Sequence, residues 1–318
     1  MLSKLVTGDN RPEIIMFDVG SYYENKDMIF PELLDLSDIG FDLGAVSENA
    51  IAAESVDGKL RSLPWGILAT GFVVNTTLLD SLGLSIPQTH EQFDSVCETL
   101  VEKGYTPIQG FYEQIMNNDL KYHIAVTDGK ESYYDMFAEV KEGCGELFLN
   151  EFTAMLEMTE KNFISSEIND SIPDNYEGNI LHFFEGETPF LCFSTEEFSG
   201  MKKRESKSEA FMAEPFEYEF VSLPISSDEP VLSESFLPGL SVVSGSDGEE
   251  WAKEFMRFIY STDELDLMAY TKGVPSASAS ADTDPRYSRI NSLPAERVIM
   301  PYENELSAIV DENFGYTH

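Results

Sequence analysis

The chain has 318 residues, of which 20 are Lys or Arg and 58 are Asp or Glu, so its formal net charge at pH 7 is −38. A surface this negative repels phosphate backbones and anionic lipids, which argues against nucleic acid and the membrane surface as partners. With 42% hydrophobic residues, the length fits about two globular domains rather than a disordered chain. The one basic cluster, at residues 202–207, is expected to be a solvated face.

The cysteines and apolar runs exclude further classes. Cys97, Cys144 and Cys192 cannot all pair within one chain, and none has a spacing typical of zinc ligands. No apolar run approaches the ~18–20 residues of a membrane helix, and residues 1–5 lack the apolar core of a signal peptide. The sequence predicts neither a disulfide framework nor a membrane span.

The first predicted strand covers residues 13–18 and ends at Asp18, and the loop after it contains Ser21 and Tyr22. Ligands of open α/β sheets bind beyond the carboxyl ends of strands, so these side chains are candidates for ligand binding. A purely structural role, with Asp18 capping the next turn, is an equal alternative. Residues 59–64 and 70–75 are predicted as the next strands.

A helix is predicted after Thr89, because Thr89 and Gln92 form a capping box and apolar residues follow at helical spacing up to Gly104. This helix places Cys97 in the core. Residues 106–110 then form a short strand, and Phe111, Tyr112 and Glu113 follow its end. They are candidates for a binding loop, with plain packing as the alternative.

The second half continues the alternation of helices and strands. The pattern predicts a helical region over 121–162, a helix end at 181–184, strands at 189–193, 220–224 and 237–243, and an exit loop at 194–198. Strands alternating with helices favour an α/β architecture with largely parallel sheets.

Two helices are predicted near the end of this pattern. Ser246 and Glu249 read as a second capping box, opening a helix. The face shared by its large apolar residues is predicted to be core: Trp251, Phe255, Phe258 and Ile259. Another helix runs from residue 262 to 272 and stops at Gly273.

No catalytic motif accompanies these elements. The chain lacks the GxSxG, Walker, GxGxxG and HExxH patterns, its four histidines have no partner at a ligand spacing, and the full calcium-loop pattern is absent. We therefore expect no enzyme, no cofactor and no metal. Aromatic and polar side chains at strand ends suit a sugar, because aromatic faces cover pyranose C–H groups while carboxylates and amides bond the hydroxyls.

Several motifs in a characteristic order resemble those of the extracellular solute-binding proteins of carbohydrate ABC transporters, the family of the maltose-binding protein. In chain order they are LVTGDNRPEIIMFD at 5–18, LPWG at 63–66, VVN at 73–75, LGLSIPQTHEQF at 82–93, GYTPI at 104–108, FEGE at 184–187, WAKEF at 251–255 and GVPS at 273–276. The resemblance spans almost the whole chain.

The resemblance implies a two-lobe α/β fold, the type II periplasmic-binding-protein fold, with a hinge between the lobes. Lobe 1 would hold residues 1–69 and 237–274, and lobe 2 would hold 70–236 and 275–318. Compared with the family pattern, the signal and the first strand-helix unit are missing before residue 8, so lobe 1 is expected to be N-terminally truncated.

The resemblance also implies a ligand site between the lobes and a set of residues for it. With the strand-end candidates, these ligand-binding residues are Phe17, Asp18, Ser21, Tyr22, Trp65, Phe111, Tyr112, Glu113, Thr195, Glu196, Phe198 and Phe236. Phe198 is included because the family commonly carries Gly-x-Trp after the strand at 189–193, and this chain has a different sequence there.

The expected function is binding of an extracellular carbohydrate, an oligosaccharide, by a monomer that delivers it to the membrane permease of an ABC importer. The expected location is extracellular, as a cell-surface lipoprotein or in the periplasm. Three alternatives stay open: a non-transport sensor or interaction protein with this fold, a binder of a solute other than sugar, and a glycoside-processing enzyme with two carboxyl groups facing each other.

Overall fold

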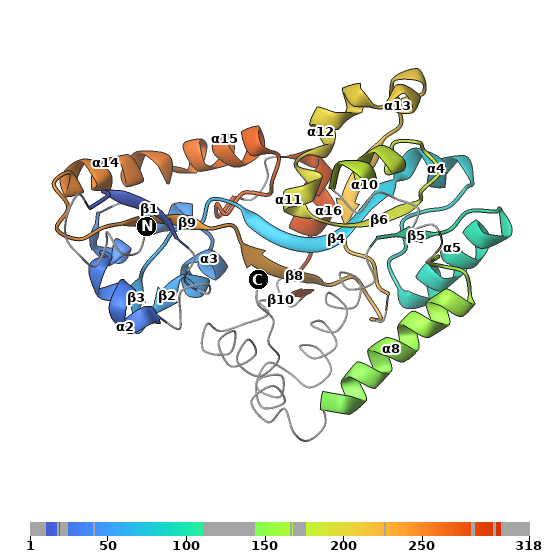
Figure 1. Ribbon diagram of the computed structural model, residues 1–318, viewed down its shortest axis with the longest axis horizontal. Coiled ribbons are helices and arrows are strands. Elements are labelled where there is room, and N and C mark those ends of the chain that lie inside the picture. Colours follow the sequence, from blue (N-terminus) through green and yellow to red (C-terminus); the bar gives the residue numbers. More distant parts are fainter. Residues whose placement is uncertain are drawn as a thin grey trace. The chain divides into compact units, whose positions relative to one another are not determined.

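The computed structural model describes residues 11–17, 19, 25–40, 42–110, 144–165, 167, 176–225, 227–280, 284–294 and 297–299. They form two compact units (Figure 1): the first holds residues up to 68 together with 235–280, and the second holds 69–234 together with 284–299. The sequence predicts that the chain passes from one lobe to the other near residues 69, 237 and 274. In the structure, residues 275–280, which were predicted in lobe 2, belong to the first unit.

The first unit is built on an antiparallel pair of strands, β1 (Ile14–Phe17) and β9 (Gly239–Val242), with Phe17 opposite Gly239. Because side chains alternate along a strand, Ile15 and Phe17 point to one face, where they pack with Ile29 and Phe30. The predicted strand at 13–18 is thus confirmed over Ile14–Phe17.

Short elements follow β1 in the first unit: α2 (Lys26–Ile29), η2 (Phe30–Glu32), η3 (Leu36–Asp38), η4 (Leu43–Ala45), α3 (Glu48–Ala53), β2 (Ser55–Val56) and β3 (Lys59–Leu60). Strands β2 and β3 form a hairpin whose turn residues, Asp57 and Gly58, both have positive φ. A two-residue hairpin turn favours Asp-Gly for this reason. Only Lys59–Leu60 of the strand predicted at 59–64 is regular strand.

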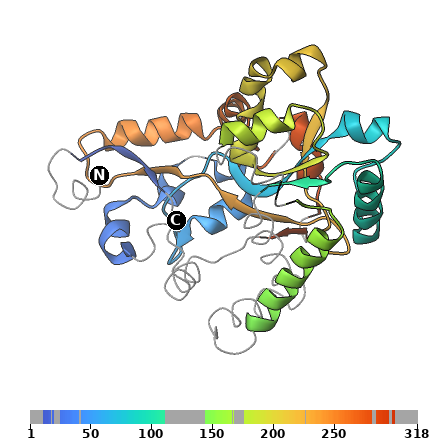
Figure 2. The ribbon, with the colours of Figure 1, turned by 45° about the vertical axis from the view of Figure 1, so that its right-hand side comes forward.

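Two longer helices, α14 (Glu249–Ile259) and α15 (Thr262–Lys272), lie one after the other along one side of the first unit (Figures 1 and 2), and α14 packs against β9. Helix α15 ends at Gly273, whose φ of 75° is the left-handed conformation that glycine adopts readily. The predicted capping box at Ser246 is wrong: the Glu249 carboxylate accepts from the Gly245 N–H at 2.7 Å, and the Ser246 hydroxyl donates to the Val243 carbonyl.

The predicted core face of α14 is also wrong. The residues that point inward are Ala252 and Met256, whereas Trp251, Phe255 and Phe258 are exposed. The helix has apolar residues on two faces, and burial of the smaller ones brings its backbone close to the sheet. Periodicity alone could not tell which face packs.

The sheet of the second unit is mixed, so the predicted largely parallel arrangement is wrong. Its strands are β4 (Ile67–Asn75), β5 (Ile108–Gln109), β6 (Phe190–Ser194), β7 (Tyr218–Val221), β8 (Leu232–Phe236) and β10 (Val298–Ile299). The order is β10-β8-β4-β6-β5, with β7 also paired to β4. Strand β4 is antiparallel to β6 and β7, while the β5–β6 and β8–β10 pairs are parallel.

The helices and 3-10 turns of the second unit are α4 (Thr76–Ser81), α5 (His90–Glu102), α8 (Cys144–Glu160), α10 (Tyr176–Phe183), α11 (Thr195–Phe198), α12 (Met201–Arg204), η5 (Glu205–Lys207), α13 (Glu209–Ala213), η6 (Pro285–Tyr287) and α16 (Ser288–Asn291). Helix α5 confirms the predicted helix, and Cys97 lies in the core. The Thr89 side chain accepts from the Gln92 N–H, but the Gln92 side chain bonds the Gln88 N–H at 2.8 Å.

The predicted helical region at 121–162 is confirmed over α8, and its residues 121–143 lie outside the described residues. Among the helices described, none combines the length and the apolar character that a membrane crossing requires.

Candidate ligand-binding site

Three of the predicted ligand-binding residues, Phe17, Trp65 and Phe236, lie on neighbouring backbone segments of the first unit. Phe17 pairs with Gly239 on β9, and the next segment along carries Trp65, since Leu63 bonds Leu240 on the other side of β9. The Leu237 N–H donates to the Gly66 carbonyl at 3.0 Å. Phe236 and Trp65 directly precede these two residues in the chain, so their backbones lie close to each other. The pairing therefore gathers these three aromatic residues in one region of this unit.

The exposure of these residues differs. Phe17 is buried and packs edge-on against Phe30, with ring centroids 5.7 Å apart. Phe236 is also buried, whereas Trp65 is half-buried against the cluster of Leu237 and Val274. Of the three, Trp65 offers the most ring surface to a ligand.

Buried polar contacts fix the backbone around β1. The Ser62 hydroxyl donates to the Phe17 carbonyl at 3.0 Å. Just beyond the strand, the Val19 N–H donates to the buried Glu54 carboxylate at 3.3 Å. Two side chains from other segments thus hold the chain on either side of position 18, the predicted binding residue after this strand.

In the second unit, the predicted exit loop after β6 is the short helix α11, so that part of the prediction is wrong. Its start is a capping box: the Ser194 hydroxyl accepts from the Glu197 N–H at 3.1 Å, and the Glu197 carboxylate accepts from the Ser194 N–H at 2.8 Å. The signal S-x-x-E stands in the sequence and could have predicted the helix.

The three predicted binding residues of α11 have different surroundings. Thr195 is fully buried, and its hydroxyl oxygen accepts from the Ala69 N–H at 3.1 Å. Phe198 is equally buried, with ring centroids 5.2 Å from Tyr287 and 5.5 Å from Phe220. Glu196 is exposed. Of these three residues, only Glu196 has a side chain that is open to solvent.

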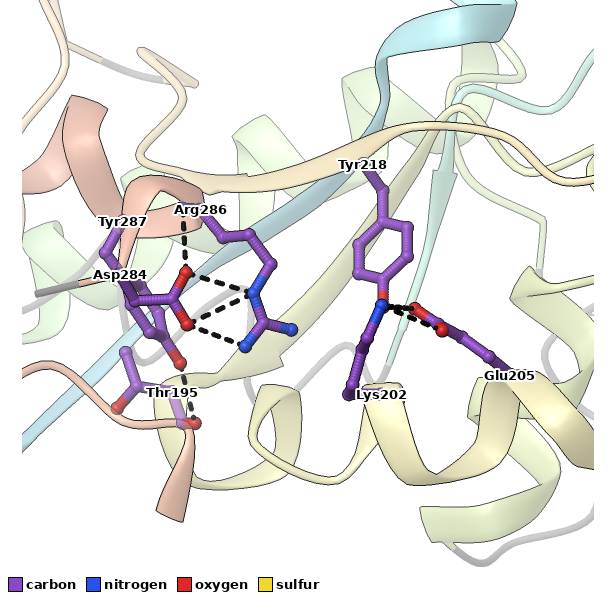
Figure 3. A network of polar contacts seen from close by, with 7 residues as sticks. All are labelled: Thr195, Lys202, Glu205, Tyr218, Asp284, Arg286 and Tyr287. Carbon is purple, nitrogen blue, oxygen red and sulfur yellow. Dashed lines mark hydrogen bonds and ion pairs between the residues drawn. The ribbon is translucent and has the colours of Figure 1, made fainter. Parts of the chain in front are cut away.

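An arginine completes the surroundings of Phe198. The Arg286 guanidinium lies 5.0 Å from the Phe198 ring centre. It also bonds the Asp284 carboxylate at 2.7 Å (Figure 3). Burial opposes ionisation of Asp284, but the hydrogen bonds from Arg286 hold its pKa below the usual value. Nearby, the Tyr287 hydroxyl donates to the Thr195 carbonyl at 3.4 Å. These contacts fix α11 and the residues that Phe198 packs on.

The same network extends to Tyr218 and helix α12 (Figure 3). The Tyr218 hydroxyl donates to the Glu205 carboxylate at 2.8 Å, and Lys202 forms an ion pair with Glu205 at 3.0 Å. Burial, reinforced by the Glu205 charge, raises the pKa of the Tyr218 hydroxyl. Tyr218 therefore remains a neutral donor, which suits a structural hydrogen bond.

A polar cluster at the end of β5 was not predicted from the sequence. The Gln109 carbonyl oxygen accepts from the Thr188 hydroxyl at 2.8 Å and lies 2.8 Å from Nδ1 of His182. Gln109 is buried and stands two residues before the predicted binding residue Phe111. Its partners lie 73 and 79 residues away in the chain, so no local pattern could reveal the cluster.

Half of the predicted binding residues lie outside the described residues: Asp18, Ser21, Tyr22, Phe111, Tyr112 and Glu113. Their role stays a prediction, as does ligand contact by the six that are described.

Among the described residues, no cluster of three or more His, Cys, Asp or Glu could hold a metal ion. Burial raises the pKa of the Cys97 and Cys192 thiols, so neither is a ready nucleophile. What the described strand ends offer is aromatic surface, carboxylates and hydroxyls, which are groups for binding.

The chain belongs to the bacterial extracellular solute-binding proteins, whose family profile matches residues 3–295. The fold agrees with solved structures of sugar-binding proteins. RafE of Streptococcus pneumoniae, in complex with raffinose, has 13% identity and a TM-score of 0.70 over 99% of this chain and 86% of that one. A sugar transporter protein from Bacillus licheniformis in complex with stachyose has 19% identity and a TM-score of 0.66, over 99% and 83%.

A chitin oligosaccharide binding protein has 21% identity and a TM-score of 0.67 over 97% of this chain and 76% of that one. At these identities the likeness shows the shared two-lobe fold of solute-binding proteins. A search of curated protein sequences finds no match. The family and the solved neighbours are binding proteins rather than enzymes.

Proposed function

We propose that the protein binds an uncharged oligosaccharide and delivers it to the permease of an ABC importer. The observation that carries the proposal is the match to the solute-binding family together with the likeness to structures holding raffinose and stachyose. The aromatic and polar residues at strand ends of both units supply the two kinds of contact that sugars need.

The charge of the chain favours a neutral ligand. A net charge of −38 makes the surroundings of any site unfavourable for an acidic sugar, because the anion approaches through a negative field. Raffinose and stachyose are uncharged, so the field leaves them unaffected. We therefore place neutral oligosaccharides before uronates as the substrate class.

Trp65 and Glu196 are the described residues that we assign to sugar contact, one in each unit. Trp65 is a half-buried aromatic on a segment that leads into β4, and Glu196 is an exposed carboxylate on α11, fixed by the capping box beside it. Phe17, Thr195, Phe198 and Phe236 are buried and would shape the site from behind. Working outside the cell and as a monomer belongs to the same proposal.

The test is isothermal titration calorimetry with raffinose, stachyose, chitin oligosaccharides and digalacturonate, each also screened by thermal shift. We expect a neutral oligosaccharide to bind and raise Tm, and digalacturonate to bind at least tenfold more weakly. Trp65→Ala should weaken the sugar at least tenfold, because stacking on the ring is lost.

Trp251→Ala is the matched control, since it removes the other tryptophan of the chain from an exposed position. It should leave the sugar affinity unchanged. No response to any sugar, together with a response to peptides, would reject a carbohydrate ligand. Hydrolysis of the bound sugar would reject a purely binding role.

A further inference from the structure

The chain that follows α15 is rich in serine and runs beside the segment that carries Trp65. It covers residues 275–280, with the sequence PSASAS, and belongs to the first unit. We call it the serine segment. The Ala277 N–H donates to the Trp65 carbonyl at 3.3 Å, and the Ile67 N–H donates to the Pro275 carbonyl at 2.9 Å. The backbone of Trp65 is therefore bonded to the serine segment.

The serine segment is also held on its other side and is mostly buried. The Ala279 N–H donates to the Ala45 carbonyl at 2.9 Å. Ser276, Ala277 and Ser278 are buried, although serine and alanine tracts are common in exposed loops. The segment is thus a built part of the first unit.

Asp266 of α15 binds the hydroxyl groups of this segment. One of its carboxylate oxygens accepts from the Ser278 hydroxyl, and the other accepts from the Ser280 hydroxyl at 2.9 Å. Alternate side chains of an extended chain point the same way, which lets these two serines reach one carboxylate. Hydrogen bonds to an ionised acceptor are stronger than those between neutral groups. Asp266 therefore ties the serine segment to α15.

Trp65 packs against the two parts of the chain that Asp266 joins. The tryptophan lies against a cluster of Leu237, Ala269 and Val274. Ala269 belongs to α15 and comes three residues after Asp266, so the two share one face of the helix. Val274 directly precedes the serine segment. The packing surface of Trp65 thus combines α15 with the chain that leads into the serine segment.

The contact beside Trp65 leaves little free space. A Cβ placed at Gly66 would lie 2.9 Å from Cγ2 of Val274 and 3.3 Å from the Pro275 carbonyl oxygen. Closely packed groups pass a displacement to their neighbours. A shift of the serine segment would therefore move the chain at Trp65.

We propose that Asp266 is a positioning residue for Trp65. It keeps the serine segment and α15 together, and these two elements fix the backbone and the packing surface of the tryptophan. This role rests on the proposed function, because Trp65 is the aromatic residue assigned to sugar contact there. A loosely supported ring binds a sugar more weakly, since the ligand must then restore the orientation of the ring.

The test uses the whole chain with Trp251→Phe as the parent protein. Trp251 is exposed and is the second of two tryptophans, so all tryptophan emission of this parent comes from Trp65. Acrylamide quenching in the absence of sugar measures how open the ring is, and calorimetry with raffinose and stachyose measures affinity. We expect Asp266→Ala to raise the quenching constant and to weaken the sugar about fivefold, the effect of roughly one lost hydrogen bond.

Two variants separate the hydrogen bonds of Asp266 from its charge. Asp266→Asn keeps an oxygen for the Ser278 hydroxyl and an N–H for the Ser280 oxygen, so both measurements should stay within about twofold of the parent. Asp263→Ala removes an exposed carboxylate from the same helix and should leave both measurements unchanged.

Ser280→Ala is a milder change than Asp266→Ala. It removes one of the two hydrogen bonds at an exposed position, and it should shift the quenching and the affinity in the same direction by a smaller amount. Circular dichroism verifies that each variant is folded. If Asp266→Ala does not fold, an unchanged quenching constant in Ser280→Ala overturns the proposal.

Two further results would overturn it: equal quenching of Trp65 in the parent and in folded Asp266→Ala, and an equal loss of sugar affinity in Asp263→Ala. If raffinose and stachyose bind the parent and their affinity is unchanged in Asp266→Ala, the proposed function stands and the positioning role fails. If no sugar binds the parent, the proposed function fails, and the quenching comparison alone decides whether Asp266 positions Trp65.

Discussion

Glu234 is a carboxyl group placed among apolar neighbours. It lies on β8 with its side chain on the same buried face as Leu232 and Phe236. Burial raises its pKa to about 7, so the folded protein holds the proton more tightly than the unfolded chain does. Folding is therefore favoured below the ordinary glutamate pKa, and this contribution falls as the pH rises from there to about 7, above which it is lost.

Glu234→Gln removes this titration while keeping the shape of the side chain. We expect the variant to be more stable than the parent at pH 8 by on the order of 2–3 kcal/mol, and the gap to close at pH 4.5. Urea unfolding from pH 4.5 to 8 measures the difference. Glu91→Gln, at an exposed position on α5, is the control. A gap that is the same at both ends of this range would contradict the buried-acid account.

At the scale of single residues, the local sequence pattern predicted the burial of Cys97 correctly and that of Trp251 wrongly. Cys97 belongs to a helix with a single apolar face, so its spacing leaves one choice of core. Trp251 belongs to a helix whose alternative face, Ala252 and Met256, packs instead. The Gln109–His182 contact could not be predicted for a different reason, because it joins segments far apart in the sequence.

Among the elements, α11 depends on its capping box because it has little else of its own. The helix is four residues long, and the reciprocal bonds of Ser194 and Glu197 satisfy two of its end groups. Ser194→Ala should cost about 1 kcal/mol of unfolding free energy, measured by denaturant titration. Ser199→Ala, whose hydroxyl bonds only the Glu196 carbonyl at the end of the helix, should cost a few tenths at most. Equal losses of unfolding free energy in the two variants would show that the capping box does not stabilise α11.

Strand β4 depends on Gly71. The residue is paired to Phe193 on β6, and a Cβ placed there would lie 2.6 Å from the Val221 carbonyl oxygen and 2.9 Å from the Phe220 ring. Gly71→Ala must therefore push β7 away from β4, at a cost of about 3 kcal/mol. At Gly104, where φ is +91° and nothing lies within 4 Å, the same change strains only the backbone, by about 1 kcal/mol. Thermal unfolding of both variants ranks the two losses, and the reverse order would contradict the steric argument.

The elements with strong local signals were predictable, and the way they pair was not. Helix α5 and strand β6 follow from a cap and from an apolar run. Strand β8 was missed because its sequence, LSESF, alternates apolar residues with Ser and Glu and has few residues typical of strands. The antiparallel pairing of β4 with β6 and β7 joins segments of the second unit that are far apart in the sequence, which no local pattern encodes.

The two-lobe fold was predictable at the scale of the whole molecule because its motifs recur in a fixed order along the chain. The net charge of −38 is a property of the same scale. Like charges repel more strongly in the compact state than in the expanded chain, so the excess of acid destabilises the fold. Salt shortens the range of this repulsion to about 3 Å at 1 M from about 30 Å at 0.01 M.

We therefore expect Tm to rise by a few degrees, about 1–2 kcal/mol of stability, between 0.01 and 0.5 M NaCl at pH 7.5. Calorimetry at constant protein concentration measures the shift. The affinity for an uncharged oligosaccharide should stay within twofold over the same range, since no ion pair forms with it. A falling Tm would mean that attractive ion pairs such as Arg286–Asp284 outweigh the general repulsion. A sugar affinity that falls steeply with salt would reveal a charged group in the ligand that the protein recognises.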